Sequence, residues 1–195
     1  MYDGIVLEFT DPTIINTLGR KNSINQYQMA VKFNPLERIT TVLGFFYTVG
    51  QNGNITPMVR YSPIEFLGAI HTKSTLSSYE RFTKLNLNIG DQIKLTYVND
   101  VMPYVFNMDI EANRQNHNRI KSEDEFFPTH CPVCGTELLL SSQGRTKFCP
   151  NMNCGGRSVA RLTNMLDKLE VKDFSQSSVE QLQIVSFHEL MNMSI

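Results

Sequence analysis

The only cysteines in the chain are four that lie close together, at Cys131, Cys134, Cys149 and Cys154. Two residues separate the first pair, fourteen separate the two pairs, and four separate the second pair. Zinc takes four thiolates at tetrahedral corners, and a tight turn presents two sulfurs to one ion. The alternatives are two disulfides or free thiols, but this clustering does not resemble a secreted disulfide framework. We therefore expect structural Zn²⁺ in a closed site that folds its segment and does not catalyse.

The residues around the cysteines predict a small zinc ribbon over residues 128–156. Turn-forming residues flank both pairs, at Pro132, Gly135, Pro150 and Gly155. Between the pairs, Glu137–Leu140 and Thr146–Phe148 can form a short hairpin across Gly144. His130 adjoins the first cysteine, but four thiolates already complete the site, so we assign no histidine to the metal.

Length, composition and charge limit the classes of protein to which this chain can belong. The 195 residues suffice for one medium domain or two small ones, and 41% of them are hydrophobic. The net charge of −1 predicts no global field toward nucleic acid or membrane, although a local basic patch would suffice for DNA. No apolar run is long enough to span a bilayer, and the N-terminus lacks a basic region followed by an apolar one. We expect a cytoplasmic protein.

Residues 36–112 predict the barrel that must position the ribbon. Five segments read as strands: ITTVLGFFYTV, ITPMVRYSPIEF, the start of GAIHTKSTLSSYERFTKL, IGDQIKLTYV and VMPYVFNMDI. Asn52-Gly53 is a hairpin-turn signal, and the prolines of the second strand suit strand ends or an edge. In the fourth strand Ile93, Leu95 and Tyr97 alternate with Lys94 and Thr96. Five strands with a short helix before the fourth is the element order of an OB-fold.

The flanking regions are smaller. Residues 1–35 predict two short strands, YDGIVLEF and QMAVKF, around a helix that begins at Asp11-Pro12 and stops at Gly19. Residues 113–127 are polar without apolar periodicity, and we interpret them as a linker. In 157–195 the first helix carries an apolar stripe, formed by Val159, Leu162, Met165, Leu166 and Leu169. The expected fold is mainly β: a five-stranded OB-fold barrel with an N-terminal strand segment, a small four-cysteine zinc ribbon and a short C-terminal helical segment.

The order of these motifs resembles NAD-dependent DNA ligase of the bacterial type. The similarity is carried by VGQNGNITP, by IGDQI followed by DVMPYV, and by FPTHCPVCG with CPNMNCGG, in collinear order over nearly the whole chain. The resemblance implies that residues 1–35 end a nucleotidyltransferase domain, 36–112 form the OB domain, and 128–156 form the zinc finger. Residues 157–195 resemble the opening helices of a helix–hairpin–helix domain.

One part of the family's chemistry is absent from the sequence. The nucleophilic lysine of these ligases lies in a KxDG motif, and no lysine here is followed two residues later by Asp-Gly. Without it the chain cannot adenylate itself. We expect the C-terminal portion of a split ligase, inactive alone, whose partner is a separate chain carrying the NAD-binding and KxDG domains. Such a split would suit a bacteriophage genome, in which case the compartment is the host cytoplasm.

The resemblance also assigns residues to the adenylate pocket. Asp3 matches the aspartate of the family's DG motif, and Lys32 matches a lysine that reaches the AMP phosphate, where a cation stabilises developing negative charge. Two positions depart from the family pattern: Glu8 stands where the family has a functional lysine, and Gln51 where it has a DNA-contacting arginine. Taken alone, Lys32 reads as a solvated strand-end lysine.

Six residues are candidates for contacting DNA: Gly53, Thr56, Lys73, Arg145, Lys147 and Arg157. Basic residues near four thiolates also balance charge, and a lysine on a barrel strand also serves solubility, so both interpretations stand.

The expected activity is the sealing of nicked duplex DNA in replication and repair. NAD and Mg²⁺ would bind through the partner chain, and this chain would hold the duplex by its backbone. The alternatives are an OB-fold and zinc module that binds single-stranded DNA through aromatic platforms, and a scaffold that binds only the ligase partner.

Overall fold

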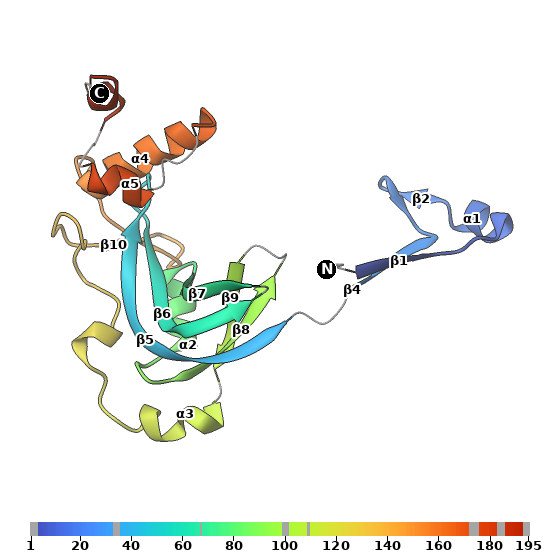
Figure 1. The fold of residues 1–195 in the computed structure, drawn as a ribbon, viewed down its shortest axis with the longest axis horizontal. Coiled ribbons are helices and arrows are strands. Elements are labelled where there is room, and N and C mark those ends of the chain that lie inside the picture. The colour runs from blue at the N-terminus through green and yellow to red at the C-terminus, as the bar shows by residue number, and fades with distance from the viewer. Residues whose placement is uncertain are drawn as a thin grey trace.

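A computed structural model describes residues 4–32, 36–66, 68–98, 102–108, 110–171, 176–182 and 186–192. A small N-terminal unit stands away from a curved β-barrel, the zinc ribbon and the C-terminal helices lie at one end of that barrel, and α3 lies at the other (Figure 1). The predicted mainly β architecture is confirmed.

The N-terminal unit is a hairpin with a helix in its connection. β1 (Gly4–Glu8) pairs antiparallel with β4 (Gln28–Lys32), and β2 (Arg20–Lys21) pairs with β3 (Ile24–Asn25). The helix α1 (Pro12–Leu18) begins as predicted, because the Asp11 carboxylate accepts the Thr13 N–H at 2.8 Å. It ends at Gly19, whose φ of +57° suits glycine. No described residue of this unit is buried.

The barrel is one five-stranded antiparallel sheet in the order β7-β6-β5-β8-β9. Its elements are β5 (Glu37–Val49), β6 (Ile55–Phe66), β7 (Ala69–Thr75), α2 (Tyr79–Leu85), β8 (Gln92–Val98) and β9 (Met102–Met108). The first part of β5 pairs with β8 and the remainder pairs with β6, so one long strand serves both halves of the curled sheet. The Ser74 hydroxyl on β7 donates to the Pro103 carbonyl on β9, so the two edge strands of the curled sheet are hydrogen-bonded to each other. The predicted element order is therefore confirmed.

Alternating apolar residues fill the barrel. The core comprises Val42, Val59, Tyr61, Phe66, Leu76, Leu87, Ile93, Leu95 and Val105. Thr96, which alternates with Ile93 and Leu95 along β8, is also buried, at 5% exposure. Of the two positions expected for the prolines of the second strand, an edge is wrong, because β6 lies between β7 and β5. Pro57 lies near the start of β6, and Pro63 falls in the irregular stretch where the register with β7 shifts between Arg60 and Ile64.

The interpretation of residues 113–127 as a linker was also wrong. This stretch contains most of α3 (Ile110–His117) and the short 3₁₀-helix η1 (Glu123–Glu125), and both are hydrogen-bonded to the barrel. The Asn113 amide closes a pair of bonds with the backbone of Gln92, at 2.7 and 2.8 Å. Glu125 is 1% exposed and accepts from the Ile89 N–H. Part of the polar composition therefore reflects hydrogen bonding to the barrel, although many side chains of the stretch are exposed.

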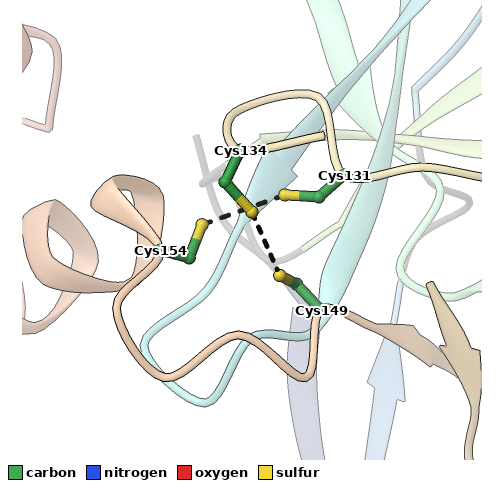
Figure 2. A group of neighbouring side chains, drawn as sticks. All are labelled: Cys131, Cys134, Cys149 and Cys154. Carbon is green, nitrogen blue, oxygen red and sulfur yellow. Dashed lines mark hydrogen bonds between the residues drawn. The ribbon is translucent and has the colours of Figure 1, made fainter. Parts of the chain in front are cut away.

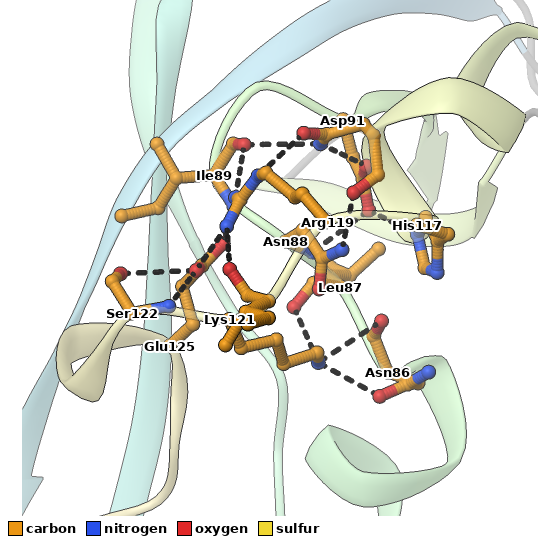
Figure 3. A network of polar contacts seen from close by, with 12 residues as sticks. Asn86, Leu87, Asn88, Ile89, Asp91, His117, Arg119, Lys121, Ser122 and Glu125 are labelled. Carbon is orange, nitrogen blue, oxygen red and sulfur yellow. Dashed lines mark hydrogen bonds and ion pairs between the residues drawn. The ribbon is translucent and has the colours of Figure 1, made fainter.

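Polar side chains connect this stretch to the loop before β8 (Figure 3). The Arg119 guanidinium donates to both oxygens of Glu125, one of them at 2.8 Å. The Asp91 carboxylate, also buried, accepts from Asn116 at 2.6 Å and lies 2.8 Å from His117 Nε2. The Arg119 guanidinium holds the pKa of Glu125 at about 2. Both partners of this ion pair also bond to the backbone of Ile89, which fixes η1 against the loop before β8.

The C-terminal part is helical. The helices are α4 (Gly155–Lys168), α5 (Gln176–Gln181) and α6 (Phe187–Met191). Of the predicted stripe, Val159, Leu162 and Leu166 are buried with Val179, whereas Met165 and Leu169 stay exposed. In the described part of the chain, no helix has the length and apolar character needed to cross a membrane.

Candidate metal centre and nucleic-acid interface

The four cysteine sulfurs converge on one point (Figure 2), all within 4.8 Å of one another. The Sγ atoms of Cys131 and Cys154 are 3.9 Å apart, and those of Cys134 and Cys149 are 3.5 Å apart. A tetrahedral zinc with Zn–S bonds of about 2.3 Å requires sulfurs roughly 3.8 Å apart. The thiols are not joined as disulfides. The cluster therefore has the geometry of a zinc site with four thiolate ligands.

Turns and strand ends position the four sulfurs. Gly135, with φ +68°, donates to the Cys131 carbonyl and closes the first turn. Cys149 directly follows β11 (Lys147–Phe148), which pairs with β10 (Leu139–Leu140) as the predicted hairpin. Cys154 is the N-cap residue of α4. The ligands thus tie three elements to one point.

The thiols differ in their environments. Burial raises the pKa of Cys149 to about 12 and also raises the pKa of Cys154. Hydrogen bonding to Thr136 lowers the pKa of Cys134 to about 6. Because zinc binds thiolates, metal binding at this cluster must release protons and should weaken in acid.

The zinc ribbon is joined to the barrel through the turn between β5 and β6. Cys149 donates its N–H to the Gly53 carbonyl at 2.9 Å, and Arg157 Nη1 donates to the Cys149 carbonyl at 3.2 Å. Gly53 has φ +85°, and a Cβ there would lie 2.6 Å from the Cys149 oxygen. Only glycine fits this approach. The cysteines also share an apolar cluster with Val49 and Ile55 of the barrel.

The predicted DNA-contacting residues fall into two groups. Gly53 and Arg157, which is 7% exposed, are buried in the junction just described. The other four reach solvent. Thr56 is on β6 and pairs with Thr48 of β5, and Lys73 is on β7 and pairs with Arg60 of β6. Lys147 is on β11, and Arg145 lies just before this strand. Contact with DNA stays a prediction for all six. The sequence did not reveal the junction role of the first group, although a glycine in a hairpin turn was the available signal.

Of the predicted adenylate-pocket residues, only Lys32 lies within the described part of the chain, at one end of the N-terminal hairpin. Lys32, at the end of β4, is exposed and pairs in register with Gly4 on β1. A Cβ at Gly4 would lie 2.6 Å from the Val31 carbonyl oxygen, so the strands approach closely here. Glu8 accepts a hydrogen bond from Gln28 at 2.7 Å. Asp3 lies outside the described residues.

Comparison with known proteins identifies relatives. Residues 39–117 match the NAD-dependent DNA ligase OB-fold domain family, a range that includes α3. A protein named DNA ligase from Prosthecochloris aestuarii is 30% identical over 184 residues, which cover 92% of this chain and 26% of the relative. The DNA ligase of Helicobacter pylori is 30% identical over 185 residues, covering 93% and 27%. That of Pediococcus pentosaceus is 28% identical over 187 residues, covering 95% and 27%. The chain spans about a quarter of the length of these relatives.

Proposed function

We propose that this chain, which belongs to the NAD-dependent DNA ligase family as the counterpart of a C-terminal portion of these enzymes, holds nicked duplex DNA and completes the adenylation site of a separate chain. The partner would carry the NAD-binding domain and the KxDG lysine, since no such motif occurs in these 195 residues. The family relationship supports the ligase activity of the assembly.

The proposal of a partner chain rests on one observation, the exposure of apolar side chains in residues 4–32. Large apolar side chains of this unit are exposed: Ile5, Val6, Leu7, Phe9, Ile14, Leu18, Ile24 and Met29. A two-stranded hairpin without a buried core is marginal in water. An exposed apolar surface of this kind marks an interface. We infer that the nucleotidyltransferase domain of the partner supplies the missing core.

Docking in this way would bring Lys32 into the adenylate pocket. The pairing of Lys32 with Gly4, the glycine of the DG motif, supports this assignment. The overall reaction would adenylate the KxDG lysine from NAD, transfer AMP to the 5′-phosphate at the nick, and close the phosphodiester by attack of the 3′-hydroxyl with release of AMP. Lys32 would stabilise charge on the transferring phosphate. NAD and Mg²⁺ would bind through the partner, with Mg²⁺ neutralising phosphate charge.

The zinc ribbon would help the chain to hold the DNA duplex. A closed site with four thiolate ligands contributes folding free energy and no open coordination position. In this chain it orders the start of α4 and holds the β5–β6 turn through Gly53 and Cys149. The exposed Lys73 and Arg145 and the half-buried Lys147 would contact the DNA backbone, which positions a protein without reading sequence.

Reconstitution tests the proposal. The chain alone should neither consume NAD nor become adenylated, and adding a KxDG-bearing nucleotidyltransferase chain should produce sealing of a nicked duplex. The control is the same partner without this chain. If no partner preparation seals nicks in the presence of this chain, while the chain still binds DNA, the enzymatic proposal is contradicted and a non-enzymatic DNA-binding module is favoured. Binding to the partner without binding to DNA would favour the scaffold.

A further inference from the structure

A pocket of about 400 Å³ lies where α2, the segment after α3 and the zinc ribbon meet. Six of its lining residues define what we name the aromatic–lysine pocket: Tyr79, Phe82, Lys121, Phe126, Phe127 and Lys147. Thr83 and Asn86 complete the lining, and no acidic residue of the described chain takes part. Its volume is at the lower end of the range of small-ligand sites, which is roughly 300–1,000 Å³.

The aromatic rings form a mutually packed wall. Phe127 makes edge contacts with Tyr79 at 5.0 Å and with Phe82 at 5.5 Å between ring centroids. Such edge-to-face packing fixes ring orientation. Phe126, the next residue, is 58% exposed at the mouth of the pocket, although its backbone carbonyl is held by the Tyr47 hydroxyl at 3.1 Å. The pocket thus combines a rigid wall with one ring available to a ligand.

Two ammonium groups make the pocket electropositive. Lys147 Nζ lies 5.0 Å from the ring centre of Tyr79 and 5.5 Å from that of Phe127. Within the described chain, Lys147 makes no ion pair with an acidic side chain. Lys121 Nζ donates to Asn86 Oδ1 at 2.7 Å, which holds its charge beside the pocket (Figure 3). An anionic ligand with a flat apolar part would complement this arrangement.

We propose that the aromatic–lysine pocket takes one unpaired nucleotide of a DNA strand, with its base against Phe126 and its phosphate directed to Lys147. Aromatic rings interleaved with cations bind unstacked bases with little sequence preference. A base-paired nucleotide cannot enter, because its ring faces are stacked within the duplex. The inference rests on the proposed function in supposing that DNA is the ligand. It adds that the chain favours a nick with an unpaired end over a fully paired nick.

The test uses the full chain, two nicked duplexes and three variants. One duplex is fully paired, and the other carries a single unpaired 2-aminopurine at the nick. For the parent we expect tighter binding of the unpaired duplex and quenched 2-aminopurine fluorescence. Phe126→Ala should weaken that binding about tenfold, with little change for the paired duplex. Lys147→Gln should weaken binding of the unpaired duplex by a larger factor than binding of the paired duplex, whose backbone Lys147 also contacts under the proposed function. Lys84→Gln is the control, because Lys84 is exposed on α2 and pairs with Glu80 outside the pocket.

Three results would overturn the assignment. Equal weakening of both duplexes would show an ordinary backbone contact, and unchanged binding of both would exclude the pocket from DNA binding.

A titration of the chain with dAMP, followed by NMR chemical shifts of the pocket residues, separates this inference from the proposed function. If the chain binds no duplex but dAMP shifts the pocket resonances in the parent and not in Phe126→Ala, the pocket stands and the proposed DNA grip fails. A polyglutamate peptide that binds the pocket more tightly than dAMP would replace the nucleotide with an acidic protein segment.

Discussion

The N-terminal unit and the barrel with its zinc ribbon differ in whether they bury an apolar core. In residues 4–32 hydrogen-bonded strands and a capped helix form, yet no described residue is buried. In residues 36–171 an apolar barrel core adjoins a second cluster that contains the cysteines. Local signals therefore suffice to form secondary structure, but a core determines whether a region stands alone. The barrel and ribbon have their own core, and the N-terminal unit has none.

The largest expected effect comes from removing the metal. We expect one zinc per chain, and structural zinc sites contribute on the order of 10 kcal/mol at neutral pH. Chelation should unfold residues 128–156 and leave the barrel strands protected in hydrogen exchange. Cys154→Ser should act in the same direction, because it removes one of the four candidate ligands. Metal analysis without zinc, together with mass spectra showing two disulfides, would contradict the assignment.

The next effect is loss of the buried Glu125 carboxylate. Glu125→Ala leaves the N–H groups of Ile89 and Ser122 without their acceptor, so it should lower the free energy of unfolding of the barrel by about 3 kcal/mol. Glu123→Ala, an exposed neighbour on the same turn, is the matched control. An equal effect of both substitutions in chemical denaturation would show that η1 does not anchor the segment.

The same carboxylate predicts a pH dependence. The folded pKa of Glu125 is about 2, below its ordinary value of 4.5. The carboxylate therefore contributes stability that is complete above about pH 4.5 and is lost as the pH falls toward 2. Glu125→Gln should flatten this part of the stability profile relative to the parent. Parallel profiles for the two proteins would contradict the assigned pKa.

A smaller effect is expected at the junction of ribbon and barrel. Gly53→Ala places a Cβ at positive φ and 2.6 Å from a backbone oxygen, which should cost about 1–3 kcal/mol. Gly144→Ala, also at positive φ but with open space around it, controls for the strain alone. Thermal unfolding should show the larger loss for Gly53→Ala. The reverse order would show that the turn can move away from the ribbon.

The smallest effect on stability should come from the exposed apolar face. Val6→Asp should leave the unfolding of the isolated chain unchanged, because Val6 is 64% exposed. It should nevertheless weaken binding to the KxDG-bearing partner at least tenfold, because a charge would be buried there without a pair. The control is Ile70→Asp, which changes an equally exposed residue on the barrel. Unchanged partner binding by Val6→Asp would remove the N-terminal unit from the interface.

Much of the fold could be predicted because it follows from local pattern. Asp11 and Gly19 delimit α1, alternation locates the strands, and paired cysteines with turn residues locate the ribbon. Residues 113–127 could not be predicted, since their partners, such as Gln92 and Ile89, are distant in sequence. Polar side chains that bond to a distant backbone look like a solvated linker. For the same reason nothing local showed that Arg157 is buried against the Cys149 carbonyl.

Nick sealing by a Lys32→Ala chain tests the central claim most directly, that the N-terminal hairpin completes the adenylate pocket of a partner. Lys21→Ala, an exposed lysine of the same unit, is the matched control. With the KxDG-bearing partner present, Lys32→Ala should slow sealing by about two to three orders of magnitude. Zinc content and unfolding should not change, and Lys21→Ala should seal as the parent does. Sealing by Lys32→Ala at the parent rate would contradict the account.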